Sequence, residues 1–132
     1  MTKVPLTADG RYASSTDPST WNTLEAVTAS EHGEGIGIVL GDGIGCVDLD
    51  DAIVDGVVLP WAQEIIDANR GTFVEVSQSG NGVHIWGYLD EQPGRVIRDG
   101  RSIEVYSAGR YIALGTPMPD ASPVLRPLVV PR

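Results

Sequence analysis

The chain has 132 residues, of which 42% are hydrophobic and 20% are charged, and its formal net charge is -9. This size allows one domain with one core, and this composition excludes a generally disordered chain. This negative charge argues against binding of nucleic acid by bulk electrostatic attraction, because proteins that bind nucleic acid in that way usually present a basic face. We therefore expect weak DNA binding by this chain alone.

Membrane and secretory signals are not expected in this sequence. Its apolar runs are far shorter than the roughly 20 residues that span a bilayer, and its first residues lack the apolar core of a signal peptide. Cys46 is the single cysteine, which excludes an internal disulfide. We expect a cytoplasmic protein with no membrane partner.

The expected elements follow one another as helix, hairpin, helix, two strands and a second hairpin. Their ranges are 18–29 (helix), 36–40 with 44–50 (hairpin), 60–69 (helix), 73–76 and 83–88 (strands), and 102–106 with 110–115 (hairpin). Asp17 and Pro18 are typical of a helix start. Asp42-Gly43 is typical of a hairpin turn, and Gly109 can take the left-handed conformation that a short loop needs.

The remaining segments are expected to be irregular. Residues 1–15 contain turn formers, residues 90–100 read as a polar loop, and the proline-rich residues 117–132 read as an extended or mobile tail. The fold class is therefore α/β (α+β): one domain over residues 1–116 with a mixed, mostly antiparallel sheet. The helices should lie on one face of the sheet, and the other face should be open.

Polar side chains gather on one side of three expected strands. Side chains alternate along a strand, so Asp48 and Asp50 face away from the apolar residues of segment 44–50. The two strands at 83–88 and 102–106 alternate in the same way and place His84 and Glu104 on the polar side. If the three strands share a sheet, these four side chains converge.

Three carboxylates brought together repel one another unless a cation compensates their charge. Carboxylate oxygens without sulfur ligands suit Mg²⁺ or Mn²⁺ better than Zn²⁺. Each motif by itself has a simpler interpretation, because an Asp-x-Asp pair is commonly a solvated strand face and a strand histidine is commonly structural. Only the joint arrangement predicts a metal site.

Three segments stand in the order 46–50 (CVDLD), 79–84 (SGNGVH) and 103–106 (IEVY), the last followed by GRY at 109–111. Together they resemble the motifs of the archaeo-eukaryotic primase superfamily, most closely the primase-polymerase domains of phage and plasmid replication proteins. Upstream segments extend the resemblance, which covers about residues 3–116. It implies an RRM-like primase-polymerase core.

The resemblance implies a role for each matching residue. Asp48, Asp50 and Glu104 would bind two divalent ions, Mg²⁺ or Mn²⁺, and would be catalytic together with His84. The nucleotide-binding residues would be Ser79, Gly80, Asn81, Gly82, His84 and Arg110. The implied function is DNA-templated nucleotidyl transfer, as a primase or polymerase of phage or plasmid DNA replication. Expected partners are nucleoside triphosphates, single-stranded or primed DNA, and a helicase or second primase subunit.

Other interpretations stay open at this point. A noncatalytic, primase-like nucleotide-binding subunit would fit the acidic charge, and a metal-dependent nuclease would use the same carboxylates with water as the nucleophile. Arg95, Arg98 and Arg101 form a local basic cluster, which either contacts template phosphates or belongs to a solvated loop.

Overall fold

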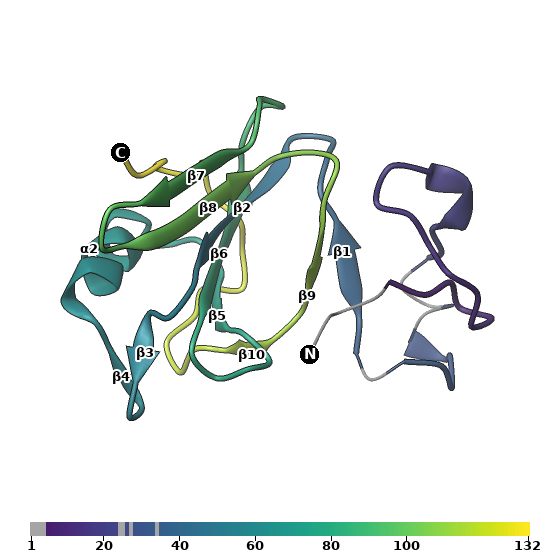
Figure 1. The fold of residues 1–132 in the computed structure, drawn as a ribbon, viewed down its shortest axis with the longest axis horizontal. Helices are drawn as coiled ribbons and strands as arrows, with labels where there is room; N and C mark the ends of the chain where they lie inside the picture. Colours follow the sequence, from purple (N-terminus) through teal and green to yellow (C-terminus); the bar gives the residue numbers. More distant parts are fainter. Residues whose placement is uncertain (1–4, 24–25, 27, 34) are drawn as a thin grey trace.

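A six-stranded sheet forms the centre of the computed structural model, which describes residues 5–23, 26, 28–33 and 35–132 (Figure 1). The strands lie in the order β10-β5-β6-β2-β8-β7, and each ladder between them is antiparallel. They are β2 (Ile44–Leu49), β5 (Val74–Val76), β6 (Val83–Tyr88), β7 (Arg95–Arg98), β8 (Ser102–Tyr106) and β10 (Thr116–Pro117). The mostly antiparallel sheet expected from the sequence is confirmed.

Short elements surround this sheet. They are the strand pair β1 (Gly37–Val39) and β9 (Tyr111–Ala113), the strand pair β3 (Ile53–Val54) and β4 (Val57–Val58), the 3₁₀ turn η1 (Pro18–Thr20) and the helix α2 (Pro60–Ala68). Across the described residues, no helix has the length and apolar character that crossing a bilayer requires.

Helix α2 forms where it was expected and packs on one face of the sheet (Figure 1). Pro60 begins it, since the fixed backbone angle of proline suits the first helical turn. Ala62 and Ile65 are buried against the strands. Asn69 ends the helix by donating from Nδ2 to the carbonyl of Ile65 (3.0 Å), and Gly71 follows with φ at +91°.

The sheet face beneath α2 is the apolar face that the alternation predicted. Its most deeply buried residues are Val47, Leu49, Val83, Ile85, Ile103 and Val105. Burial of each such side chain stabilises the fold by about 1.5–3 kcal/mol. Strands β2 and β5 run in the same direction with antiparallel β6 between them, so the expected strand-helix-strand unit is present in split form.

The opposite sheet face is covered at one end and accessible at the other. Cys46, Trp86 and Tyr106 lie in a second apolar cluster with Leu40, which follows β1, and Ile112, which lies on β9. The far end of this face, where β2 ends, holds half-buried polar side chains instead. The expected open face is therefore open only near the end of β2.

Both expected hairpins are wrong in their strand pairing. Asp42 and Gly43 make the expected turn with φ at 54° and 84°, yet β1 pairs with β9 rather than β2. Strand β8 pairs with β2 and β7, and β7 occupies the segment expected to be a polar loop. Turn residues specify where a chain reverses, whereas strand partners depend on packing between distant segments.

The helix expected over residues 18–29 does not begin at residue 18, so this prediction is wrong for its first part. Only Pro18–Thr20 forms a 3₁₀ turn capped by Asp17, and Trp21 is extended with φ −90° and ψ 152°. Local side-chain bonds compete with the helix, since Thr20 Oγ1 donates to backbone carbonyls and Trp21 Nε1 donates to that of Ser14. Residues 26 and 28 are helical, and residues 24, 25 and 27 lie outside the described residues.

Residues 118–132 are mostly irregular, with a turn at 119–120, and parts of this segment pack on the domain. The side chain of Asn69 bonds both backbone groups of Val129, at 2.8 and 3.1 Å. Gly115 allows the chain to lie close to β5 just before this segment, because a Cβ at residue 115 would lie 1.8 Å from the carbonyl oxygen of Val76. Apolar residues of this segment pack against the core: Met118, Leu128 and Val130.

Candidate metal centre

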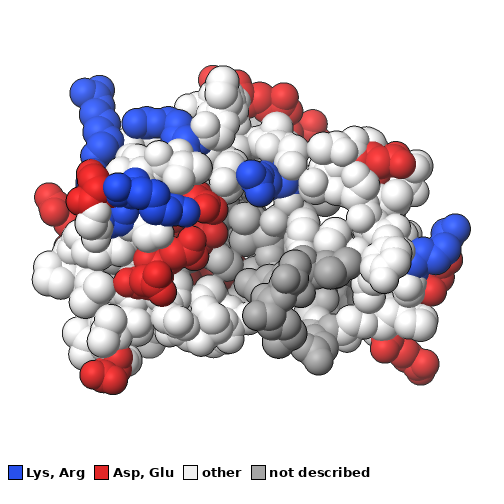
Figure 2. All heavy atoms as spheres, viewed as in Figure 1, with Lys and Arg blue, Asp and Glu red and all other residues white. Residues whose placement is uncertain are grey.

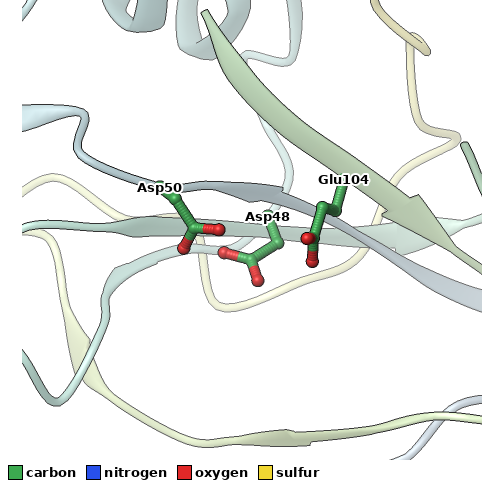
Figure 3. Close-up of side chains that lie close together, drawn as sticks. All are labelled: Asp48, Asp50 and Glu104. Atoms are coloured by element: carbon green, nitrogen blue, oxygen red, sulfur yellow. The ribbon is translucent and has the colours of Figure 1, made fainter. Parts of the chain in front are cut away.

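Three carboxylates meet on the accessible part of the sheet. Asp48 on β2 is paired in register with Glu104 on β8, and Asp50 follows β2 by one residue. One oxygen from each side chain lies within 4.8 Å of the others. Figure 3 shows the three carboxylates extending to the same side of the sheet. The convergence predicted from the strand alternation is confirmed for these three side chains.

The backbone explains why Asp50 stays on this face. Its N–H donates to the carbonyl of Ser102 at 2.9 Å, so the ladder with β8 continues past the last residue of β2. Two residues of a strand that are two apart share a face, and Asp50 therefore follows Asp48. Asp51 then takes a left-handed conformation with φ at 51°, which ends the extended chain that continues from β2.

The electrostatics of the cluster favour a bound cation. Burial raises the pKa of Asp50 above its ordinary value, and the negative charge of Glu104 raises it further. Arg98 acts in the opposite direction and donates from its guanidinium to Glu104 across 2.7 Å. Half-buried carboxylate oxygens are the donor set that hard divalent ions prefer, so the residues present fit a metal ion.

His84 lies beside the cluster on β6. It is paired in register with Asp48, and its Nε2 atom lies 3.6 Å from Asp48 Oδ1. Its Nδ1 atom lies 2.9 Å from Glu75 Oε1. The structure thus brings together the four side chains expected to converge, although His84 is buried rather than open to solvent.

Glu75 is the polar residue of this site that the motif reasoning missed. It lies on β5 opposite His84, with 1% of its surface exposed. The alternation of segment 73–76, in which Glu75 stands between Val74 and Val76, was the signal for its position. Alternation alone could not reveal that β5 borders β6.

The glycine-rich turn lies at the end of the sheet where β2 ends. The carbonyl of Asn81 accepts from the N–H groups of Ala52 and Ile53, the residues just after the Asp50–Asp51 pair. Ser79 shares a hydrogen bond with the hydroxyl of Ser77. Ser79, Gly80 and Asn81 are exposed, while Gly82 is buried.

Arg110 borders the same site from the segment before β9. Its guanidinium lies over the ring of Tyr106, 4.4 Å from the ring centre. A hollow of about 210 Å³ is lined by residues of both β9 and the sheet. It is lined by Asp48, His84, Glu104, Tyr106, Arg110, Tyr111, Ile112 and Ala113.

A second hollow of about 330 Å³ lies on the other side of the cluster. Its lining comprises Asp50, Asp51, Leu59, Trp61, Arg98, Gly100, Arg101 and Ser102. Two members of the expected basic cluster line it, and both are ion-paired, Arg98 with Glu104 and Arg101 with Asp99. Figure 2 shows acidic and basic side chains next to one another on this side of the molecule.

The chain is similar to a phage DNA primase-polymerase. It is 32% identical over 125 residues to the DNA primase-polymerase of Nitratiruptor phage NrS-1. The match covers 86% of this chain but 17% of the phage protein, so the chain spans about a sixth of the length of this relative. No family model matches the sequence. The similarity supports the relationship that the three motifs indicated.

Proposed function

We propose that this chain is the catalytic core of a primase-polymerase of the archaeo-eukaryotic primase superfamily. It would add nucleotides, taken from nucleoside triphosphates, to a DNA template during phage or plasmid replication. The observation that supports this most directly is the approach of Asp48, Asp50 and Glu104 to within 4.8 Å in a chain similar to a phage primase-polymerase. Residues 1–116 would form the catalytic domain, with 117–132 as an extended tail.

The carboxylates would hold the metal ions. Asp48, which lies between its two partner strands, and Asp50 would contribute to a shared pair of sites, and Glu104 would complete one of them. When bound, two divalent ions such as Mg²⁺ or Mn²⁺ stabilise both the attacking and the leaving oxygens of an in-line phosphoryl displacement. The protein's own contribution is to keep these oxygens on one face of a rigid sheet.

The groups around the hollow would bind the nucleotide. His84 Nε2 and the guanidinium of Arg110 both face the space next to Asp48, where a triphosphate would approach the metal ions. The exposed turn residues Ser79, Gly80 and Asn81 would add backbone and hydroxyl contacts without bulk. Positioning and charge neutralisation account for most of the rate in phosphoryl transfer.

DNA binding would depend on more than this chain. Its net charge of -9 opposes attraction of a phosphate backbone. Arg95, Arg98 and Arg101 would supply local template contacts, and further affinity would come from a helicase or a second primase subunit.

A primer-synthesis and primer-extension assay tests the proposal. The protein is incubated with single-stranded or primed DNA, nucleoside triphosphates and Mg²⁺ or Mn²⁺, alone and with the product of the adjacent gene. We expect metal-dependent nucleotide addition that falls at least about 100-fold in Asp48→Asn, because the substitution removes a negative charge with little change in shape.

The same assay can include a control variant and can distinguish the two alternative functions. Asp55→Asn makes the same chemical change in the β3–β4 turn and should leave the activity unchanged. Degradation of DNA without added nucleotides would identify a nuclease instead. Nucleotide binding without turnover, with and without the partner, would identify a noncatalytic subunit.

A further inference from the structure

Glu75 is a buried carboxylate to which the proposed chemistry assigns no role. It pairs in register with His84 on β6, and His84 pairs in register with Asp48 on β2. Three polar residues thus lie in a line across three neighbouring strands, with the apolar side chains of Phe73, Trp86 and Cys46 along one side of the line. Burial of a carboxylate costs several kcal/mol unless hydrogen bonds compensate, and an apolar residue would satisfy packing alone.

Glu75 has hydrogen bonds with two side chains, those of His84 and Trp86. Its Oε1 atom accepts from Trp86 Nε1 at 3.0 Å and lies 2.9 Å from His84 Nδ1. Burial acts to raise the pKa of Glu75, but hydrogen bonds from His84, Trp86 and the backbone of Gly115 outweigh it and leave the pKa below its ordinary value. An ionised carboxylate only accepts hydrogen bonds, so Nδ1 of His84 carries a proton.

This arrangement leaves one nitrogen of His84 facing the site. With Nδ1 bound to Glu75, Nε2 faces Asp48 Oδ1 at 3.6 Å and borders the hollow that Arg110 also lines. The imidazole is 4% exposed and meets the Trp86 ring edge-on, so it has little room to rotate. The orientation and the tautomer of His84 therefore depend on a residue that does not itself reach the hollow.

We propose that Glu75 is a positioning residue: it accepts from Nδ1–H and so fixes the His84 ring with Nε2 directed into the hollow, where Nε2, when it also carries a proton, donates to a phosphate oxygen of the bound nucleotide. The identity of the ligand rests on the proposed function, whereas the hydrogen-bond arrangement is a property of the chain by itself. Partners of this kind, one step removed from the ligand, typically change affinity or activity by 10–100-fold when replaced.

Two measurements test the proposal, and the first requires no activity. The chain has two histidines, and exposed His32 serves as an internal reference for ¹⁵N NMR of the imidazoles at one fixed pH without metal. We expect Nδ1 of wild-type His84 to carry a proton. Glu75→Gln should give a mixture of protonated and unprotonated Nδ1, because an amide can either accept from Nδ1–H or donate to unprotonated Nδ1. Trp86→Phe, which removes the other side-chain donor to Glu75, should keep Nδ1 protonated.

The second measurement is a double-mutant cycle on nucleotide binding, by calorimetry with Mn²⁺ and a nonhydrolysable nucleoside triphosphate. Glu75→Gln should raise the Kd about tenfold in the wild-type background and leave it unchanged in the His84→Ala background. An unprotonated Nδ1 in wild-type His84, or equal effects in both backgrounds, would overturn the proposal. If the wild type binds no nucleotide, the proposed function fails, and the NMR result still decides whether Glu75 positions His84.

Discussion

The guanidinium of Arg98 lies 2.7 Å from Glu104 Oε1, so one of the three clustered carboxylates is held by a cation that the protein itself supplies. The pair links the edge strand β7 to the centre of the site on β8. A guanidinium neutralises charge but occupies one of the two Glu104 oxygens that a metal ion could use. Arg98 and a divalent ion are therefore expected to compete for Glu104.

Arg98→Gln should tighten Mn²⁺ binding. The expected change is about two- to fivefold, since a partly exposed ion pair is worth about 0.2–1 kcal/mol. Calorimetric titration of the protein with Mn²⁺ measures it. Arg70→Gln is the matched control, because Arg70 pairs with Asp67 near the end of α2 and not with the cluster. Weaker or unchanged Mn²⁺ binding in Arg98→Gln would contradict the competition.

Asp50→Asn should stabilise the metal-free fold while it weakens Mn²⁺ binding. Burial and the charge of Glu104 raise the pKa of Asp50, so its ionised form is unfavourable in the folded state. We expect a gain in unfolding free energy of up to about 1 kcal/mol at neutral pH, kept small by solvent screening. Urea unfolding with EDTA measures it.

The raised pKa of Asp50 also predicts how the stability of the wild type depends on pH. A folded-state pKa above the unfolded value means that the folded state binds more protons between the two values. The contribution of Asp50 to stability therefore rises as the pH falls through its raised pKa, and it levels off below the ordinary value of 3.8. The wild-type and Asp50→Asn stabilities should converge on acidification. If the difference between the two unfolding free energies stayed constant from pH 7 to pH 4, the raised pKa of Asp50 in the folded state would be refuted.

His84→Ala should weaken triphosphate binding more than metal binding. The imidazole reaches the hollow through Nε2, whereas the three carboxylates keep their mutual geometry without it. We expect about a tenfold rise in the Kd of a nonhydrolysable nucleotide and less than a twofold change in the Kd of Mn²⁺. Calorimetry with each ligand separates the two, and the reverse ordering would place His84 among the metal ligands.

Gly115→Ala should destabilise the fold by about 1–3 kcal/mol, the usual cost of overpacking. The added Cβ would lie 1.8 Å from the carbonyl oxygen of Val76 and would push β10 away from β5. Thermal unfolding followed by circular dichroism measures the loss. An unchanged melting temperature would mean that β10 does not hold this position in solution.

Local sequence chemistry predicted much of the secondary structure. Alternation assigned Val47 and Leu49 to one face and Asp48 to the other, because the period of a strand is two residues whatever its partner. Pro60 and Gly71 marked helix α2, because both act through their own backbone angles. The joint position of Asp48, Asp50 and Glu104 also followed from alternation, once a shared sheet was assumed.

Only the tertiary structure decided which strands are neighbours. The partner of β1 is β9, some 70 residues away, and β7 forms in a segment with little apolar alternation because Ile97 packs on the core. The positions of Glu75 beside His84 and of Arg98 beside Glu104 follow from the same pairings. Side-chain direction is a local property of the chain, whereas strand order depends on the burial of surfaces from distant segments, and the sequence pattern therefore determined the first but not the second.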